Sequence, residues 1–440
     1  MAVNSVVNPV TPSLSSTSDF SRTPYSLYSS RQQYAFLAIL FLVTASNYFD
    51  YYILSVVLEP IKQEFHVSDT MLGLLSGICF ALVYAVAGFP IARWADRGNR
   101  RIIITLALGL WSVITLCCGL ARSFGQLAIA RFGLGLVEPA ALPPSQSLVA
   151  DYFAPERRAT ALAVLTTGSA AGYLFGVALG GYVAATHGWR AAFLFAGVPG
   201  IALTILVPLV LSEPRLQLGF PTGDNLESVP QAVRNLCHKS SFLLTLVGIS
   251  AYCIFAYGFN TFLPSFMIRT LHATLAEVSV TWGTAICIAS VIGAVSGGFL
   301  ADRLSRVDVR WYAWLPAAAC FVGMPLYWAA LAANRLWVFI AFDFLAETIV
   351  GIGIPVAFAA VHAVCGNRRR ATAVAAVQFS LTLFGAGLGP LLVGMFSDVL
   401  GSAYGADSLR HSLFGVLLFL VPAAAAFFWS GLTIPRDLES

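Results

Sequence analysis

Residues 130–161 read ARFGLGLVEPAALPPSQSLVADYFAPERRATA, an apolar stretch that carries one arginine and one glutamate before a basic turn. Arg131 and Glu138 are seven residues apart, so on an α-helix they lie on nearly the same face, about 10 Å apart along the axis. A charged side chain inside a membrane costs several kcal/mol unless it is paired or hydrated, and such residues mark functional sites by default. The stretch therefore predicts a membrane-spanning helix that contributes two charged groups to an interior site.

The composition of the whole chain is that of a membrane protein. Of its 440 residues, 58% are hydrophobic and only 10% are charged, and the mean hydropathy is +0.79. A spanning helix needs about 20 apolar residues, and runs of this length favour helices over the short alternating strands of a barrel. Twelve segments are long enough, near 33–58, 70–92, 102–121, 126–150, 159–185, 190–211, 242–268, 277–300, 311–332, 336–362, 371–398 and 411–433.

Basic residues cluster beside the ends of these segments on one side. Arg97, Arg100 and Arg101 follow the second segment, and Arg157 and Arg158 follow the fourth. Loops on the cytoplasmic side carry the excess of Lys and Arg. Placing both termini in the cytoplasm puts most of the 25 Lys and Arg residues there. We therefore expect a multi-pass protein with both termini cytoplasmic, and the compact loops favour a prokaryotic inner membrane.

Short motifs recur in the two halves of the chain. RRATA occupies 157–161 and 369–373, and ADR occupies 95–97 and 301–303, at nearly equal offsets and at equivalent places in the helix count. Tandem six-helix halves predict a pseudo-two-fold axis along the membrane normal, with a site between the halves near the midplane. The expected fold class is an all-α polytopic membrane protein with twelve transmembrane helices in two pseudo-symmetric six-helix halves.

The chain is expected to divide into four parts. Residues 1–30, rich in Ser, Thr and Pro, predict a disordered cytoplasmic tail. Residues 31–212 form the N-terminal half, 213–241 a polar cytoplasmic linker, and 242–435 the C-terminal half.

Nothing in the sequence predicts an enzyme. The sequence has no P-loop, no nucleophile constellation and no Cys/His spacing of a metal site. We therefore expect no cofactor, no metal and no nucleic-acid partner. The six histidines fall in loops or near span ends, so carboxylates are the better candidates for carrying protons.

Several longer motifs resemble those of a known family. ADRGNRR at 95–101, RFGLGLVEPA at 131–140 and the spaced glycines of the fifth segment resemble motifs of the major facilitator superfamily. NYFD at 47–50, PERRATALAV at 155–164 and GWRAAFLFAGVPG at 188–200 are similar to Spinster-type transporters within it. One position departs: Tyr51 stands where Spinster-type proteins commonly have an arginine, which removes a positive charge and argues against a phospholipid-like head group.

The resemblance also implies a gate at the inner ends of the helices. Asp96 and Arg97 would lock the inner ends of helices two and eleven in one conformational state. Arg101 belongs to the same turn, and the counterparts would be Arg158, Asp302 and Arg303. The alternative is that these charges only anchor the topology against lipid phosphates.

Four carboxylates inside the predicted spans are candidates for proton coupling. Glu138 lies near mid-membrane, where an unpaired anion is least tolerated, unless it is a permanently neutral, hydrogen-bonded acid. Asp343 and Glu347 share one face of the tenth segment. They either bind protons or pair with a cationic part of the substrate. Alternatively, Asp343 neutralises Arg131. The resemblance implies that Asp50 faces the cavity and carries the coupling proton, and the alternative is a structural ion pair with Arg131.

The candidate substrate-binding residues are Arg131, Tyr51, Tyr52, Asn260 and Tyr257. By the repeat offset, Asp50 falls near Asn260 in the opposite half. We expect a monomeric, proton-coupled secondary active transporter that works in the lipid bilayer by alternating access, with an amphipathic or organic-anion small molecule as substrate. The alternatives are a multidrug-type efflux pump and a transporter-like solute sensor; a sensor would need a signalling domain, for which the tails and linker are short.

Overall fold

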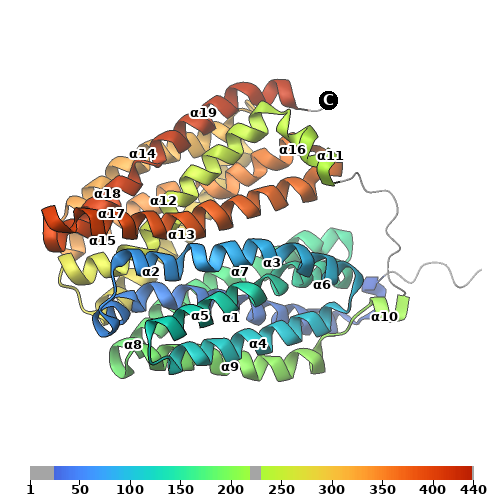
Figure 1. Ribbon diagram of the computed structural model, residues 1–440. Coiled ribbons are helices and arrows are strands. Elements are labelled where there is room, and N and C mark those ends of the chain that lie inside the picture. Colours follow the sequence, from blue (N-terminus) through green and yellow to red (C-terminus); the bar gives the residue numbers. More distant parts are fainter. Residues whose placement is uncertain (1–23, 219–228, 439–440) are drawn as a thin grey trace, which may run out of the picture.

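The computed structural model describes residues 24–218 and 229–438, and its elements in these ranges are all helices arranged in two bundles (Figure 1). The first bundle contains η1 (Pro24–Leu27), α1 (Ser30–Phe65), α2 (Asp69–Ser76), α3 (Ile78–Arg97), α4 (Arg100–Leu120), α5 (Phe124–Val137), η2 (Glu138–Ala140), α6 (Leu142–Tyr152), α7 (Pro155–Leu174), η3 (Phe175–Gly180), α8 (Gly181–His187) and α9 (Trp189–Val210).

The second bundle follows two short helices, α10 (Arg215–Leu218) and α11 (Val229–Cys237). It contains α12 (Ser240–Thr270), η4 (Glu277–Trp282), α13 (Gly283–Leu304), α14 (Trp311–Ala332), α15 (Leu336–Val350), α16 (Gly353–Ser380), η5 (Leu381–Leu388), α17 (Gly389–Tyr404), η6 (Gly405–Asp407), α18 (Ser408–Leu417) and α19 (Leu420–Asp437).

The predicted twelve spans can be followed through these helices. In the described part of the chain, ten helical stretches are long and apolar enough to cross a membrane. One of them, Thr372–Asp437, has 66 residues and holds two spans. The fourth predicted span is not among the ten because its helix is broken at Glu138. The twelve-helix fold class predicted from the sequence is therefore confirmed.

The break in the fourth span follows from its prolines. Proline has no backbone N–H and its ring clashes with the preceding turn. Pro139 lies in the 3-10 turn η2, and Pro143 and Pro144 lie in the first turn of α6. The helix therefore stops next to Glu138 and restarts, which leaves this glutamate at a helix break in the middle of the span.

The outside of the bundles is apolar. Large hydrophobic side chains point away from the protein interior, with Leu209 75% and Phe321 78% exposed. A soluble protein would gain nothing from such a surface, whereas lipid tails solvate it. The pattern matches helices that are surrounded by a bilayer.

The spaced glycines of the fifth span lie against the first helix, as their four-residue spacing predicts. A Cβ at Gly168 would lie 2.8 Å from the carbonyl oxygen of Phe41, and one at Gly176 would lie 2.8 Å from that of Phe49. A Cβ at Gly172 would overlap the carbonyl oxygen of Ala45. Since only hydrogen fits at these positions, the glycines set the distance between α7 and α1.

We expect Gly172→Leu to destabilise the protein by about 1–3 kcal/mol, because the new side chain forces α7 away from α1. The measurement is the thermal melting of purified protein in detergent. Gly298→Leu in α13 is the matched control, since nothing lies within 4 Å of a Cβ there. Equal melting temperatures for the two variants would contradict the close approach of the helices.

Of the three π-helical segments in the described residues, η3, η4 and η5, two lie at equivalent places in the two halves. One, η3, lies in the fifth span, and the other, η5, in the eleventh. Such segments often occur at functional sites in helices. Their equivalent placement agrees with the internal repeat read from RRATA and ADR.

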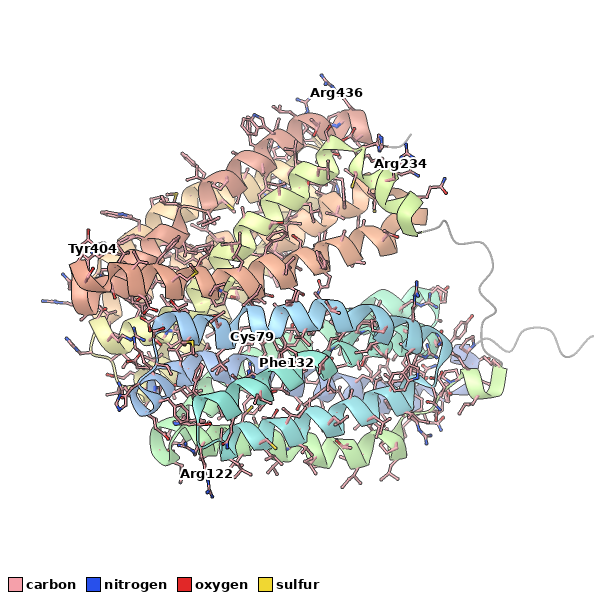
Figure 2. All side chains as sticks on the ribbon, in the orientation of Figure 1. Cys79, Arg122, Phe132, Arg234, Tyr404 and Arg436 are labelled. Atoms are coloured by element: carbon pink, nitrogen blue, oxygen red, sulfur yellow. The ribbon has the colours of Figure 1, made fainter. Side chains whose placement is uncertain are left out.

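The two bundles meet at one end and diverge toward the other (Figure 1). We call the end that holds α10, α11 and the C-terminus the terminal end, and the opposite end the far end. Figure 2 shows Arg234 and Arg436 at the terminal end, and Arg122 and Tyr404 at the far end. The halves are joined where α2 packs on α17, α1 on α12, and η3 on η4.

The expected disordered tail can be compared only from residue 24 onward, because residues 1–23 lie outside the described part. Residues 24–30 differ from that expectation. Pro24–Leu27 forms the 3-10 helix η1, and the ring of Tyr28 packs edge-on against Phe36 and Tyr152 with centroids 5.1 and 5.5 Å apart. Apolar contact with the first bundle therefore orders the chain just before α1. Residues 219–228 of the expected linker also lie outside the described part.

Candidate functional site

A cavity of about 430 Å³ lies between the two bundles. Its walls come from α1, α2, α5 and α7 on one side and from α12, α13, α15, α16 and η5 on the other. This volume is in the usual range for small-molecule sites. All five residues predicted to bind substrate line it: Arg131, Tyr51, Tyr52, Asn260 and Tyr257.

Tyrosine rings form much of the wall. Tyr52 makes edge contacts with Tyr51 and Tyr173, with ring centroids 5.0 and 4.5 Å apart, and stacks with Tyr48 at 6.3 Å. Tyr51 also reaches across the bundle interface to Tyr257, with centroids 6.4 Å apart. These rings give the cavity flat apolar faces with hydroxyl groups at their edges.

Asp50, Arg131 and Glu138 form a buried cluster in the first bundle. They are 3%, 1% and 4% exposed. Five buried atoms of the cluster have no hydrogen-bond partner: both carboxyl oxygens of Asp50, Nε and Nη1 of Arg131, and Oε1 of Glu138. The hydroxyl of Thr115 in α4 lies near the carboxyl group of Asp50, but it donates to the carbonyl oxygen of Trp111 at 2.9 Å. The structural Asp50–Arg131 ion pair considered from the sequence is therefore absent from this conformation.

The three groups lie close enough to interact electrostatically. The charge of Arg131 acts on both Asp50 and Glu138, and the two carboxyl groups act on each other. The guanidinium carbon also lies 5.9 Å from the centroid of the Phe80 ring, a cation–π contact. A buried ion without a direct partner costs several kcal/mol. Such a cluster responds strongly to any proton or anion that reaches it.

Arg131 and Glu138 face neighbouring spaces. Arg131 lines the main cavity. Glu138 lines a smaller hollow of about 70 Å³, together with Asn47 and Gln378. The two spaces share several walls, including Tyr48, Tyr51 and Tyr52. Asp50 does not line either space.

Asp343 and Glu347 lie in the second bundle with different surroundings. Glu347 lines the cavity and accepts hydrogen bonds from Ser290 Oγ at 2.6 Å and Tyr327 OH at 2.7 Å. Asp343 is 1% exposed and accepts from Trp282 Nε1 at 2.7 Å.

The alternative in which Asp343 neutralises Arg131 is wrong for this conformation. Asp343 lies on nearly the same face of α15 as Glu347, but its carboxylate accepts a hydrogen bond from Trp282 of η4 and does not line the cavity.

The residues predicted to form a gate lie at the terminal end. Asp96 and Arg97 are in the last turn of α3, and their side chains are outside the described part. Asp302 and Arg303 are exposed and form no ion pair with another described residue. Arg101 and Arg158 are half-buried, and the Nε of each has no hydrogen-bond partner. The described residues of this group are therefore not joined to one another in this conformation.

Arg100, which the sequence placed in the basic turn with Arg101, is instead completely buried. Its guanidinium binds Glu213 through Nε at 3.1 Å and Nη2 at 2.5 Å, and Nη2 lies 2.6 Å from Asp151. Nη1 donates to Ser147 at 2.8 Å. Because Glu213 follows α9, this network fixes the start of α4 to the end of the sixth span.

We expect Arg100→Met to destabilise the protein by about 3–5 kcal/mol, because it leaves Glu213 buried without its counter-ion. Adding Glu213→Met should restore part of the stability, since it removes the buried carboxylate, whereas Asp151 still lacks its partner and the backbone N–H of Arg100 loses its acceptor. Thermal melting of the two variants tests this. A double variant no more stable than the single one would show that the charge pairing is not what matters.

A second group of charged residues closes the far end. Arg269 at the end of α12 binds Asp69 through Nη1 at 2.7 Å and Nη2 at 2.8 Å, and binds Glu59 through Nε at 2.5 Å. Lys62 donates to Asp69 at 2.7 Å. Asp398 of α17 accepts from the backbone N–H of Asp69 at 3.0 Å and of Thr70 at 2.8 Å. We call Glu59, Lys62, Asp69, Arg269 and Asp398 the far-end latch.

Sequence reasoning did not find the latch. Its members appear in the sequence as ordinary charges at the ends of four different spans. The only available signal was that carboxylates and bases occur at the same end of spans from both halves. That signal does not show which of them meet.

Comparison with known proteins places these features in a family context. The family model of the Major Facilitator Superfamily matches residues 40–390. An MFS-type efflux pump of Mycolicibacterium smegmatis is 33% identical over 91% of this chain and 92% of its own length. A cis,cis-muconate transport protein of Acinetobacter baylyi is 26% identical over 84% of this chain and 90% of its own length.

A solved structure shares the arrangement of both bundles. The crystal structure of a bacterial homologue of the human lysosomal transporter Spinster, in an inward-facing and unoccupied conformation, superposes with a TM-score of 0.84. The sequences are 28% identical, and the match covers 94% of this chain and all of the other. The resemblance to Spinster-type proteins seen in the NYFD and PERRATALAV motifs is thus confirmed.

Proposed function

Since the chain belongs to the Major Facilitator Superfamily and is a multi-pass membrane transporter, we propose that it couples the movement of protons to that of an organic anion. The family consists of carriers rather than enzymes. The observation that carries the proposal is the buried Asp50–Arg131–Glu138 cluster beside the cavity, in which both oxygens of Asp50, two nitrogens of Arg131 and one oxygen of Glu138 have no hydrogen-bond partner.

The proton-coupling part rests on the carboxyl groups. Burial disfavours a charged carboxyl group, whereas the nearby guanidinium of Arg131 favours it. A substrate anion that binds Arg131 weakens this support, so Glu138 and Asp50 take up protons more readily when the site is occupied. Proton binding and substrate binding are then linked through one arginine. Glu347 and Asp343 are proposed as further proton carriers in the second bundle.

The substrate part rests on the cavity wall. Among the described lining residues, Arg131 is the cation that can receive a carboxylate, and two of its nitrogens have no partner. Tyr51, Tyr52 and Tyr257 offer faces for an apolar or aromatic body, and Asn260 offers amide hydrogen bonds. A small organic acid with a planar body fits this chemistry. The muconate transporter relative handles, by its name, a substrate of this kind.

Alternating access would expose the cavity to one side at a time. The far end is closed by the latch, and the bundles diverge at the terminal end (Figure 1). We propose that both termini are cytoplasmic, as the basic residues predict, so that this conformation faces the cytoplasm. The inward-facing Spinster homologue supports this orientation. We further propose that the transporter acts as a monomer in a prokaryotic inner membrane.

A multidrug-type efflux pump is the second candidate. The relative of Mycolicibacterium smegmatis is named as an efflux pump, and the tyrosine rings of the cavity wall offer apolar faces on which aromatic compounds without a carboxylate can also stack. The two candidates share the fold and differ in substrate range and direction.

A thermal-shift screen separates the candidates. A ligand that binds the folded state alone raises the melting temperature. We expect planar carboxylic acids, with cis,cis-muconate and benzoate as probes, to stabilise the protein, and uncharged sugars and lysolipids to have no effect. Hits must then be taken up by proteoliposomes when a pH gradient is imposed. Stabilisation by many unrelated aromatic compounds, without a carboxylate preference, would favour the efflux pump.

A further inference from the structure

The far-end latch contains two kinds of contact that respond differently when the far end opens. Arg269 and Asp398 come from the second bundle, whereas Glu59, Lys62 and Asp69 come from the first. The ion pairs of Arg269 with Glu59 and Asp69, and the bonds from Asp398 to the start of α2, therefore join the two halves. Ser397 of α17 adds a hydrogen bond to Asp69 at 2.7 Å.

The pair formed by Lys62 and Asp69 stays within the first half. Lys62 is in the last turn of α1 and Asp69 begins α2, so only a short turn separates them. Their atoms lie 2.7 Å apart. A movement of one half against the other leaves this contact in place, because both residues move together. Glu59 likewise keeps Gln63, one helical turn away at 3.4 Å.

The set of partners that Asp69 has therefore differs between the closed and the open far end. Its side chain is 3% exposed, and an uncompensated carboxylate at such a place is costly. With the far end closed, Asp69 has both Arg269 and Lys62. With the far end open, Arg269 and Ser397 withdraw, and Lys62 is the partner that remains.

We propose that Lys62 and Arg269, which bind the same carboxylate, shift the balance between the two conformations in opposite directions. Arg269 favours the closed far end, because its ion pairs exist only there. Lys62 favours the open far end, because its ammonium group and the guanidinium of Arg269 share Oδ1 of Asp69 at 2.7 and 2.8 Å, and these like charges lie so close only when the far end is closed. The inference rests on the proposed alternating access and adds to it which residues set the resting conformation.

The sizes of the two effects differ. Arg269 and its partners are mostly buried, with exposed fractions of 14% for Arg269, 7% for Glu59 and 3% for Asp69. Lys62 is 29% exposed, so solvent screens its contribution. We expect Arg269→Met to raise the ratio of open to closed far end by more than about tenfold. We expect Lys62→Met to lower the same ratio by about threefold.

The native Cys287 reports which end is open, since it lines the cavity. The experiment adds a membrane-impermeant maleimide to proteoliposomes from one side or the other and measures modification of Cys287 by peptide mass spectrometry. The ratio of the two labelling rates follows the conformational balance. Arg269→Met is expected to increase labelling from the far-end side, and Lys62→Met to decrease it.

Two further variants keep the test independent of folding defects. Glu59→Gln weakens a contact between the halves without removing Arg269, so it is expected to shift labelling in the same direction as Arg269→Met, by a smaller amount. Arg190→Met is the matched control. Arg190 pairs with Glu64 at 2.6 Å inside the first half, so its removal is expected to leave the labelling ratio unchanged.

The outcomes separate this inference from the proposed function. Shifts of Lys62→Met and Arg269→Met in the same direction would overturn the inference while leaving alternating access intact. Labelling of Cys287 from one side alone in every variant, Arg269→Met included, would overturn both. Opposite shifts, in a protein whose pH-gradient-driven uptake nevertheless fails, would support the latch and count against proton coupling only.

Discussion

Glu138→Gln is expected to abolish substrate accumulation driven by a pH gradient while leaving substrate exchange across the membrane intact. Glutamine has the shape of a protonated glutamate but cannot release a proton. The variant should therefore behave as permanently protonated at this position. One pH unit is worth about 1.4 kcal/mol per proton, so coupling to one proton supports about tenfold accumulation. We expect the variant to lose this factor completely.

The measurement compares two assays on the same proteoliposomes. Uptake under an imposed pH gradient reports coupling, and counterflow of labelled against unlabelled substrate reports exchange alone. Asp50→Asn is expected to give the same separation, since Asp50 belongs to the same buried cluster. Glu156→Gln is the matched control, because Glu156 is exposed at the start of α7. Full driven uptake by Glu138→Gln and Asp50→Asn, in folded protein, would remove both residues from the coupling mechanism.

The sequence predicts the fold well because membrane helices are decided locally. A bilayer requires each span to satisfy its own backbone and to carry a long apolar run, so hydropathy alone locates the spans. The glycine spacing at Gly168, Gly172 and Gly176 also translates directly into helix contact, because a period of four keeps the glycines on one face. The break at Pro139 belongs to the same class of local signal.

Side-chain partners are harder to predict, because they come from distant parts of the chain. Arg100 looks like one more residue of a basic turn, and its burial depends on Glu213, which is far along the sequence. Arg269 and Asp69 lie in different halves of the chain, 200 residues apart. Asp343 lies on nearly the same helix face as Glu347, yet its carboxylate accepts a hydrogen bond from Trp282 and does not line the cavity. Charges can thus be assigned to membrane depth from the sequence, but not to partners.

The predicted position of a residue along its membrane span was nevertheless enough to find residues that line the cavity. Arg131, Tyr51, Tyr52, Asn260 and Tyr257 all line one cavity, although they come from helices in different halves. The internal repeat contributed Asn260, because its offset places this residue near the equivalent of Asp50 in the opposite half. The repeat does not reveal which of these residues contact substrate, and that remains a prediction.

Arg131→Gln is expected to weaken the binding of a planar carboxylic acid by about 10- to 150-fold, because hydrogen bonds to a charged partner are worth about 1.5–3 kcal/mol. Arg131→Lys should restore only part of the affinity, since an ammonium group cannot bind both carboxylate oxygens as the planar guanidinium does. Calorimetric titration with benzoate measures the loss. Benzamide, which has the same ring but no charge, is the matched ligand control. Its interaction with the protein, detected as thermal stabilisation, should depend little on residue 131.

The same substitution should also change how binding depends on pH. Arg131 is the cation that stabilises the ionised forms of Asp50 and Glu138, so its removal favours their protonated forms. In the wild-type protein, carboxylate binding should therefore be accompanied by proton uptake, which is measured by titrating in buffers of different ionisation enthalpy. In Arg131→Gln the two acids are already protonated, and the proton uptake should disappear together with the affinity. Unchanged affinity with unchanged proton uptake would mean that Arg131 is neither the anion site nor the link between substrate and proton.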